Sequence, residues 1–494
     1  MNHALNPTTP FILSGEPLSI DDVARVARDH VAVELAPTVR PIVDRARAAV
    51  ESIASGNEPV YGINTGFGSL SRVRIDHDGL HDLQRNIVRS HAACVGEPLP
   101  KPVVRAMMLI LAASLARGHS GVRLELIERL VVMLNDDCVP VIPSRGSVGA
   151  SGDLAPLAHL ALGLIGEGDL HDSKSVEPLM LESKEGLALI NGTHMMCAIG
   201  ALAIADIDRI LAAATVSTAM AFDACRACHA PLDQRLHAVR NQPGQIAVAT
   251  RLRDLLAGSE IVEAHRENDP RVQDPYSLRA APQVLGAAVD SINHVRGTIE
   301  AELGAVTDNP LVFGEAIVSG GNFHGMPLAI SLDTLRIALC HVAGIAERRV
   351  FWVLSGTDTV NPVTPYLASD PGLHSGLMVA QYTAAALCNE LGVLAHPASP
   401  GNISTSAGIE DYNSMGATAA LLAMQAVELV RNVIAIELLT MTQAFEHQRP
   451  LKSGAGVEAA YETVRQEVAP FTEDRTPSPC IAKVAAMIEA GLIG

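Results

Sequence analysis

Apolar residues recur at helical spacing along most of the chain. One clear stripe runs through Leu80, Leu83, Ile87 and His91, which share one face of a helix. Residues 417–449 contain neither glycine nor proline, and at about 1.5 Å per residue they predict a helix of roughly 50 Å. Such a helix is too long for a small compact domain and is natural in a bundle. The pattern therefore predicts a mainly α-helical protein with a central bundle of long helices.

The chain changes character near residue 200. Residues 1–200 combine helical stretches with glycine-rich loops, whereas residues 201–494 are strongly helical. We therefore expect an N-terminal head region that carries the loops, followed by a central and C-terminal long-helix bundle. Residues 187–205 are uncharged, but Asn191 and His194 interrupt their apolar run. We interpret this stretch as a buried helix and not as a membrane span.

Composition narrows the class of protein. Hydrophobic residues make up 48% of the chain, and its formal net charge is −18, which argues against binding to nucleic acid or to anionic membranes. The N-terminus lacks the basic and apolar blocks of a signal peptide, so we expect a cytoplasmic protein with reduced cysteines. Cys225, Cys228 and His229 have the spacing of c-type haem attachment. That attachment needs export, so we interpret the match as a coincidence on a helix. No zinc, nucleotide or phosphate-loop motif occurs, and no metal is expected.

The glycine-rich string at residues 146–152 carries unusual chemistry. Glycine adopts backbone angles closed to other residues, so a tight loop is possible here. If the loop folds back, the amide nitrogen of Gly152 can attack the carbonyl carbon of Ala150. Loss of two waters, one from the Ser151 hydroxyl, then leaves a five-membered ring with an exocyclic methylidene, an electrophile made from the chain itself. For an isolated Ala-Ser-Gly, a turn that leads to a helix N-cap at Ser151 or Asp153 is the commoner outcome.

Two further segments contain candidate reactive groups. Three glycines make residues 61–68 a loop, on which Tyr61 is either a packing anchor or a reactive group. His91 ends the apolar stripe and so points inward, where an unpaired imidazole is costly. It is either a core histidine bonded to a carbonyl or a ligand for a polar group.

Residues 272–279 have the features of a carboxylate site. Asp274 can cap a helix that starts at Pro275, and Tyr276 and Arg279 then lie on one face. A guanidinium grips both oxygens of a small carboxylate. For an isolated arginine, a surface salt bridge is the alternative.

These motifs together resemble the ammonia-lyases that use a methylidene-imidazolone (MIO) cofactor, a family of histidine, phenylalanine and tyrosine lyases and related aminomutases. The fourteen residues 146–159 are the most specific part of a match that runs nearly the full length of the chain. The resemblance implies the fumarase/aspartase-like helical architecture, an MIO group formed from Ala150-Ser151-Gly152, an aromatic amino acid as small-molecule substrate, and a homotetramer whose subunits share each active site. It implies catalytic roles for Tyr61, Ala150, Ser151, Gly152, Tyr276 and Glu410, and substrate-binding roles for Ser90, His91, Asn191, His194, Gln273, Arg279, Asn322 and Phe323.

The expected reaction is elimination of ammonia from an aromatic L-amino acid. Tyr61 would remove the β-proton, for which the site must lower its pKa from about 10. Arg279 would hold the carboxylate, and Glu410 would act as a second acid or base or bind an imidazole. Ser90 and His91 are typical of the histidine-using branch, which indicates L-histidine as substrate and urocanate as product.

Several residues depart from the histidine lyases and keep other substrates open. The alternatives are tyrosine or phenylalanine, a histidine betaine, 2,3-aminomutase chemistry, and a helical scaffold that kept only the fold. Because Ser151 and Tyr61 are both present, the scaffold is disfavoured. The departures are Cys94, His194, Ala280, Ala281, Gly408 and Ile409.

Overall fold

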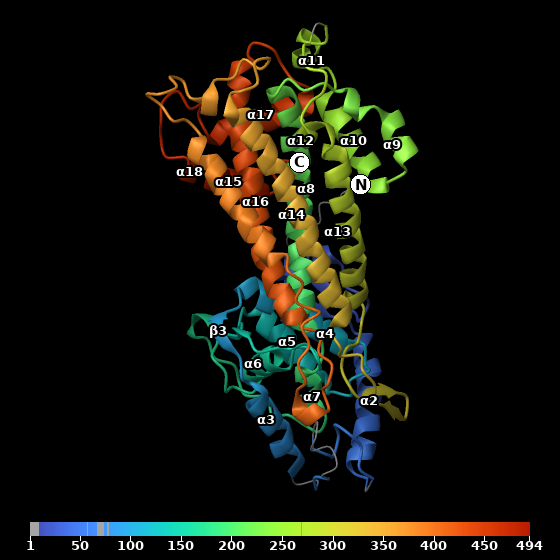
Figure 1. Ribbon diagram of the computed structural model, residues 1–494. Helices are drawn as coiled ribbons and strands as arrows, with labels where there is room; N and C mark the ends of the chain where they lie inside the picture. The colour runs from blue at the N-terminus through green and yellow to red at the C-terminus, as the bar shows by residue number, and fades with distance from the viewer. Residues whose placement is uncertain (1–8, 57, 67–73, 77–78, 268) are drawn as a thin grey trace. The chain divides into compact units, whose positions relative to one another are not determined.

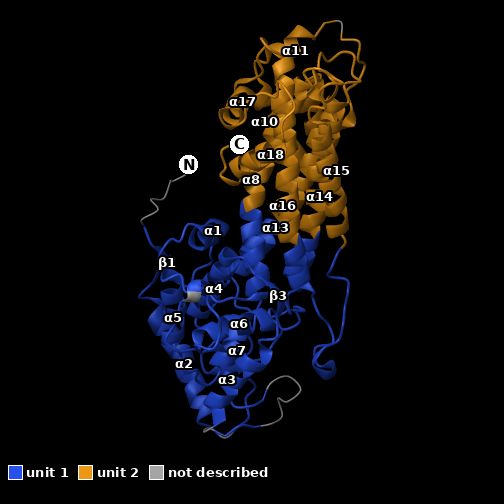
Figure 2. Ribbon diagram, turned by 90° about the vertical axis from the view of Figure 1, so that its left-hand side faces the viewer, with its two compact units in different colours: residues 1–205, 295–333, 397–422 blue, residues 206–294, 334–396, 423–494 orange. Residues whose placement is uncertain are grey.

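The computed structural model describes residues 9–56, 58–66, 74–76, 79–267 and 269–494. The chain is mainly α-helical, as the hydrophobic spacing predicts. It divides into two compact units, each assembled from three segments (Figure 2). Unit 1 consists of Met1–Ala205, Val295–Asp333 and Pro397–Leu422, and unit 2 consists of Asp206–His294, Thr334–His396 and Ala423–Gly494.

Four long helices have residues in both units, which is why each unit is discontinuous in sequence. They are α8 (His194–Ala224), α13 (Ala281–Leu303), α14 (Met326–Ser355) and α16 (Gly416–Ala444). The glycine- and proline-free stretch forms α16, whose 29 residues span about 44 Å. Figure 1 shows these helices among the labelled elements.

Unit 1 is built from short helices and three two-stranded ribbons. Strands β1 and β2 pair in parallel, with Phe11 opposite Val33, whereas β3–β4 and β5–β6 are antiparallel. Helix α4 is buried on all sides from Val103 to Ala116, as expected of a helix that is apolar all round, and forms the centre of this unit. The elements are β1 (Phe11–Leu13), α1 (Ile20–Arg28), β2 (Val33–Leu35), α2 (Val39–Ala54), α3 (Leu80–His91), β3 (Val95–Pro98), α4 (Lys101–Ala116), α5 (Leu124–Asn135), β4 (Pro143–Arg145), α6 (Leu154–Leu164), η3 (His171–Ser173), α7 (Glu185–Ile190), β5 (Leu311–Phe313), β6 (Ala316–Val318) and η6 (Ser406–Gly408).

Unit 2 places its parts of the long helices alongside α15 (Figure 1). Its core contains an ion pair: Nε of Arg349 lies 2.5 Å from Oε1 of Glu437, and both side chains are fully buried. Ser217 donates to the other carboxylate oxygen across 2.6 Å. The two buried charges are therefore compensated by their close contact and by the hydrogen bond from Ser217, as a buried ion pair requires. The remaining elements are η4 (Ala230–Leu232), α9 (Gln234–Arg240), α10 (Pro243–Leu256), α11 (Glu260–Ala264), α12 (Tyr276–Arg279), η5 (Pro365–Leu367), α15 (Met378–Leu394), η7 (Phe445–His447), α17 (Ala455–Glu467) and α18 (Ser478–Glu489).

Among the residues that the structure describes, two helical stretches are long and apolar enough to cross a membrane by length and composition. They are Met326–Ser355 and Gly416–His447, whose most apolar windows are 67% and 56% buried within the protein. The core helices of a soluble bundle have the same length and composition.

Candidate active site

The glycine-rich loop before α6 turns sharply at two of its glycines. Gly149 and Gly152 have φ values of +70° and +73°, which lie in the left-handed region that favours glycine. A Cβ atom on Gly149 would lie 2.1 Å from Oγ of Ser414, and one on Gly152 would lie 2.1 Å from the carbonyl oxygen of Gly192. No other residue fits at either position without moving its neighbours.

Segments distant in sequence hold this loop in place. The backbone nitrogen of Met415 donates to the carbonyl of Val148 across 2.9 Å, and Ser414 Oγ donates to the carbonyl of Gly149, also across 2.9 Å. On the other side, Asn191 Nδ2 donates to the carbonyl of Ser151 at 2.9 Å. The loop is thus anchored on both sides of Ala150 before any chemistry takes place.

The tripeptide itself fits the ring that the resemblance implies. Among the described residues, the Gly152 N–H donates no hydrogen bond, so this nitrogen is not held away from the Ala150 carbonyl. Ser151 Oγ donates to Oε1 of Glu410 across 2.9 Å, and Thr405 Oγ1 donates to Oε2 across 2.8 Å. No hydrogen bond from a described residue therefore competes for the nitrogen that must attack, and the hydroxyl that must leave is bonded to a carboxylate.

Asp153 does not cap α6 with its side chain. Its Oδ2 instead accepts from the backbone nitrogens of Met195 and Met196, at 2.9 and 3.0 Å, in the first turn of α8. Its Oδ1 accepts from Ser147 Oγ at 3.0 Å. Burial raises the pKa of Asp153 to about 7, although these donors oppose the shift. The aspartate thus joins the reactive loop to the start of a long helix.

A cavity of about 820 Å³ opens beside the loop, entirely within unit 1. It brings together eight of the residues expected from the sequence: Tyr61, Ser90, His91, Ala150, Ser151, Asn191, Phe323 and Glu410. Helix α3 supplies its wall through Leu83, Asn86, Ile87 and Ser90, which follow the i, i+3, i+4, i+7 spacing of one helical face.

His91 both contacts a carbonyl and faces this cavity, so the two interpretations of it are compatible. Its Nδ1 lies 2.8 Å from the carbonyl oxygen of Ile87 and 3.1 Å from Oγ of Ser90. Because a carbonyl only accepts, this contact assigns a proton to Nδ1, and in the neutral ring Nε2 is then an acceptor. The histidine therefore offers a hydrogen-bond acceptor to a ligand with an N–H group.

Other cavity residues were not singled out from the sequence. Asp411 and Tyr412 follow Glu410, and His324 bonds through Nε2 to the carbonyl of Tyr412 at 2.9 Å. The loops of residues 319–325 and 406–412 are turn-rich in the sequence, but nothing local indicates that they meet. Tyr61 lies in a loop that is described only to residue 66, so Phe67 and Gly68, the last residues of the loop expected over 61–68, lie outside the described residues.

Gln273, Tyr276 and Arg279 belong to unit 2 and do not line this cavity. Arg279 stacks on Tyr276, with Cζ 4.4 Å from the ring centre, as the three-residue spacing predicts. The expected cap by Asp274 is wrong, because α12 begins at Tyr276 and Asp274 Oδ2 accepts from the backbone of Cys228 instead. No lysine or arginine lines the unit 1 cavity among the described residues.

His194 and Asn322 do not line the cavity either. His194 is 3% exposed, and neither ring nitrogen has a hydrogen-bond partner among the described residues. Burial lowers its pKa to about 3. A Cβ on Gly192 would lie 2.6 Å from His194 Cε1, so the imidazole packs behind the loop. Asn322 is exposed, and its Nδ2 donates to the carbonyl of Val306 across 3.5 Å.

The other departures from the histidine lyases fall in different places. Ile409 lines the cavity next to Glu410, and Gly408 has a φ of +88°. Cys94 lies against the loop, since a Cβ on Gly146 would meet its Sγ at 2.7 Å. Burial raises the pKa of the Cys94 thiol to about 12, which leaves it protonated and unreactive. Ala280 and Ala281 belong to unit 2.

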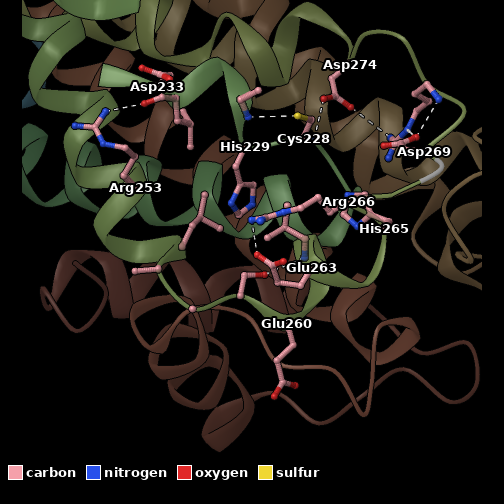
Figure 3. A pocket seen from close by; sticks show the side chains of 18 of the residues that line it. Cys228, His229, Asp233, Arg253, Glu260, Glu263, His265, Arg266, Asp269 and Asp274 are labelled. Carbon is pink, nitrogen blue, oxygen red and sulfur yellow. Dashed lines mark hydrogen bonds and ion pairs between the residues drawn. The ribbon is translucent and has the colours of Figure 1, made fainter. Parts of the chain in front are cut away.

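A larger cavity of about 930 Å³ lies in unit 2 (Figure 3). It contains Cys228 and His229, which follow the last residue of α8, so the expectation that they lie on a helix is wrong. His229 Nε2 lies 2.9 Å from Oδ1 of the fully buried Asp223. Two of the cavity's arginines form ion pairs: Arg271 contacts three aspartates, and Arg266 contacts Glu263. Arg253 also lines the cavity and bonds to the carbonyl of Leu232 and to Oγ1 of Thr250.

Comparison with known proteins identifies the family. The aromatic amino acid lyase model matches residues 18–466. The chain is 46% identical to the histidine ammonia-lyase of Myxococcus xanthus over 495 residues, which cover 97% of each protein. The structure of histidine ammonia-lyase from Trypanosoma cruzi matches with a TM-score of 0.91 and 39% identity, over 98% of this chain and 94% of that one. That of tyrosine aminomutase from Streptomyces globisporus matches with a TM-score of 0.92 and 35% identity, over 98% of both. The chain belongs to the aromatic amino acid lyase family.

Proposed function

We propose that the protein is a histidine ammonia-lyase that converts L-histidine to trans-urocanate and ammonia. The observation that carries the proposal is His91, which lines the same cavity as Ser151 and Glu410 and whose Nδ1 is bonded to a carbonyl, so that Nε2 is its acceptor. An imidazole has an N–H that this acceptor can bind, whereas a phenyl ring has none. The similarity to histidine ammonia-lyases over nearly the whole chain supports this substrate.

The prosthetic group of the family would form from Ala150-Ser151-Gly152. When present, the MIO group supplies an electrophile that takes up the substrate amine and makes it a better leaving group. The protein's part would be to hold the loop that forms this group beside the cavity. Asn191 does this through the Ser151 carbonyl, while Gly149 and Gly152 permit the loop's backbone angles.

The cavity residues then bind the substrate and move its protons. Tyr61 would remove the β-proton as general base, and His91 would bind the imidazole. Glu410, held by Thr405 across 2.8 Å, would bind the second ring nitrogen or act as a second acid or base. Each of these side chains lines the same cavity, so the three functions meet around one substrate.

The substrate carboxylate needs a cation, and the described residues that line the unit 1 cavity include neither lysine nor arginine. We propose that a second copy of the chain supplies Arg279, with Gln273 and Tyr276 beside it, in a homotetramer. Guanidinium binds a carboxylate through two parallel hydrogen bonds, and the stacking on Tyr276 holds it in one orientation. His194 and Asn322, which do not line the cavity, would act on its shape only indirectly.

A substrate panel on the purified protein tests this proposal. L-Histidine should release ammonia together with the ultraviolet absorbance of urocanate, and L-phenylalanine should react less by as much as about 10⁴-fold. A clear preference for L-tyrosine or L-phenylalanine would refute the assignment of His91 as an imidazole ligand.

A second candidate is a 2,3-aminomutase that acts on an aromatic amino acid. It is favoured by the structural match to a tyrosine aminomutase, and Ile409, an apolar residue in the cavity wall next to Glu410, suits an aromatic side chain. The same panel separates the two, because an aminomutase yields a β-amino acid and little free ammonia.

A further inference from the structure

We propose that Ser147 is a positioning residue for the ring closure of Ala150-Ser151-Gly152. The inference rests on the proposed function, because it concerns how the prosthetic group of that function forms. Ser147 takes no part in substrate binding, since it does not line the cavity.

The Ser147 hydroxyl links the two ends of the reactive loop. Its oxygen accepts from the backbone nitrogen of Gly149 across 3.2 Å. Its proton points toward the carbonyl of Gly152 at 3.2 Å and Oδ1 of Asp153 at 3.0 Å. One small side chain thus contacts the residue before Ala150 and the residues at the far end of the tripeptide.

This link differs from the loop's other anchors. Ser414 binds the Gly149 carbonyl, and Asn191 binds the Ser151 carbonyl, each from a segment outside the loop. Either anchor holds one end relative to the rest of the unit. Ser147 instead links the two ends to each other, on either side of the Ala150 carbonyl carbon and the Gly152 nitrogen that ring closure must join.

Ring closure makes one bond and releases two waters. The Gly152 nitrogen attacks the Ala150 carbonyl carbon, and this oxygen leaves as water with the hydrogens of the Gly152 and Ser151 nitrogens. The second water takes the Ser151 hydroxyl and the hydrogen of its Cα, which leaves the methylidene. The first step is intramolecular, so its rate depends on holding nitrogen and carbon close and aligned. A hydrogen bond to the Gly152 carbonyl restrains the peptide that follows the attacking nitrogen.

The loss of two waters gives a readout that does not depend on turnover. Intact-mass spectra of freshly produced full-length protein, followed over time, should show wild type about 36 Da lighter than its sequence mass. Ser147→Thr keeps the hydroxyl and should mature like wild type. Ser147→Val has nearly the shape of threonine without the hydroxyl, and we expect its maturation to slow by about tenfold or more.

Controls separate this inference from the proposed function. Ser147→Ala provides a second variant without the hydroxyl, in case valine disturbs folding, and thermal melts confirm that each variant is folded. Ser144→Ala removes a nearby hydroxyl that lies beside Gly96 and should mature normally. If the valine or alanine variant loses 36 Da as fast as wild type, Ser147 has no positioning role. If wild type itself keeps its full mass, the proposed prosthetic group is refuted instead.

Discussion

The hydroxyl of Ser151 lies 2.9 Å from Oε1 of Glu410, a residue 259 positions later in the chain. The Ser151 hydroxyl, which must leave during ring closure, therefore donates a hydrogen bond to a carboxylate of the cavity wall. Thr405 binds the other oxygen of this carboxylate, so its orientation is set on both sides. The relationship makes the serine and the glutamate the first targets for mutation.

Ser151→Ala should fold normally but lose activity, because ring closure needs the hydroxyl oxygen to leave. Intact mass should show wild type about 36 Da below its sequence mass and the variant at its full mass. An active wild-type protein of unmodified mass would contradict the mechanism.

Glu410→Gln should lower kcat by about 10²-fold or more, because an amide cannot exchange a proton as a carboxyl group does. Asp411→Asn is the matched control, since it removes the neighbouring carboxylate that also lines the cavity. Steady-state kinetics with L-histidine check both variants. Equal losses in the two would mean that only the charge of the cavity matters.

Ser90→Phe combined with His91→Leu should abolish histidine turnover and admit L-phenylalanine. The double change removes the Nε2 acceptor and makes the α3 wall apolar, and a site that loses such a bond can lose about 10⁴-fold in discrimination. Competition between the two amino acids measures the switch. Retained histidine activity would show that the imidazole binds elsewhere.

Arg279→Lys should reduce kcat/KM by about 10²-fold, because ammonium keeps the charge but not the paired hydrogen bonds. Arg253→Lys is the control, since Arg253 bonds to the carbonyl of Leu232 within unit 2.

Wild type should sediment as a tetramer at micromolar concentration. Mixed tetramers of the Arg279→Lys and Ser151→Ala chains should regain activity, because some sites then combine an intact loop with an intact arginine. An active monomer would contradict a shared site.

In the His194→Gln variant, the free energy of unfolding should fall less steeply than in wild type as the pH drops below about 6.5. The ordinary pKa of histidine is about 6.5, and burial lowers that of His194 to about 3, with Arg117 adding to the shift. Between these values the unfolded chain binds a proton that the folded chain does not. The free energy of unfolding should therefore fall as pH drops below about 6.5, by up to about 1.4 kcal/mol per pH unit.

Urea denaturation from pH 7.5 down to about pH 4 should show this slope in wild type relative to the variant. Asp153 acts in the opposite sense. Its pKa is raised to about 7 in the folded protein, so its contribution to the free energy of unfolding is present at low pH and is lost as pH rises. The comparison must therefore be between the two proteins at each pH. Parallel profiles would mean that the imidazole takes up its proton in the folded state.

The sequence by itself determined the helical class and the chemistry of the reactive loop. Hydrophobic spacing predicted α3 and α16 because burial of one helical face leaves a periodic trace in the chain. The Ala-Ser-Gly string indicated ring closure, and the need for glycine at residues 149 and 152 follows from backbone angles that are local properties.

Only the tertiary structure decided which of these residues meet. Glu410 reaches Ser151, Asp153 caps α8, and His194 packs behind Gly192, whereas Arg279 lies in unit 2. Periodicity shows that a face is buried but not what covers it, and loops far apart in sequence leave no shared pattern. The convergence of residues 61–66, 151, 319–324 and 406–412 on one cavity therefore depends on how the helices between them pack.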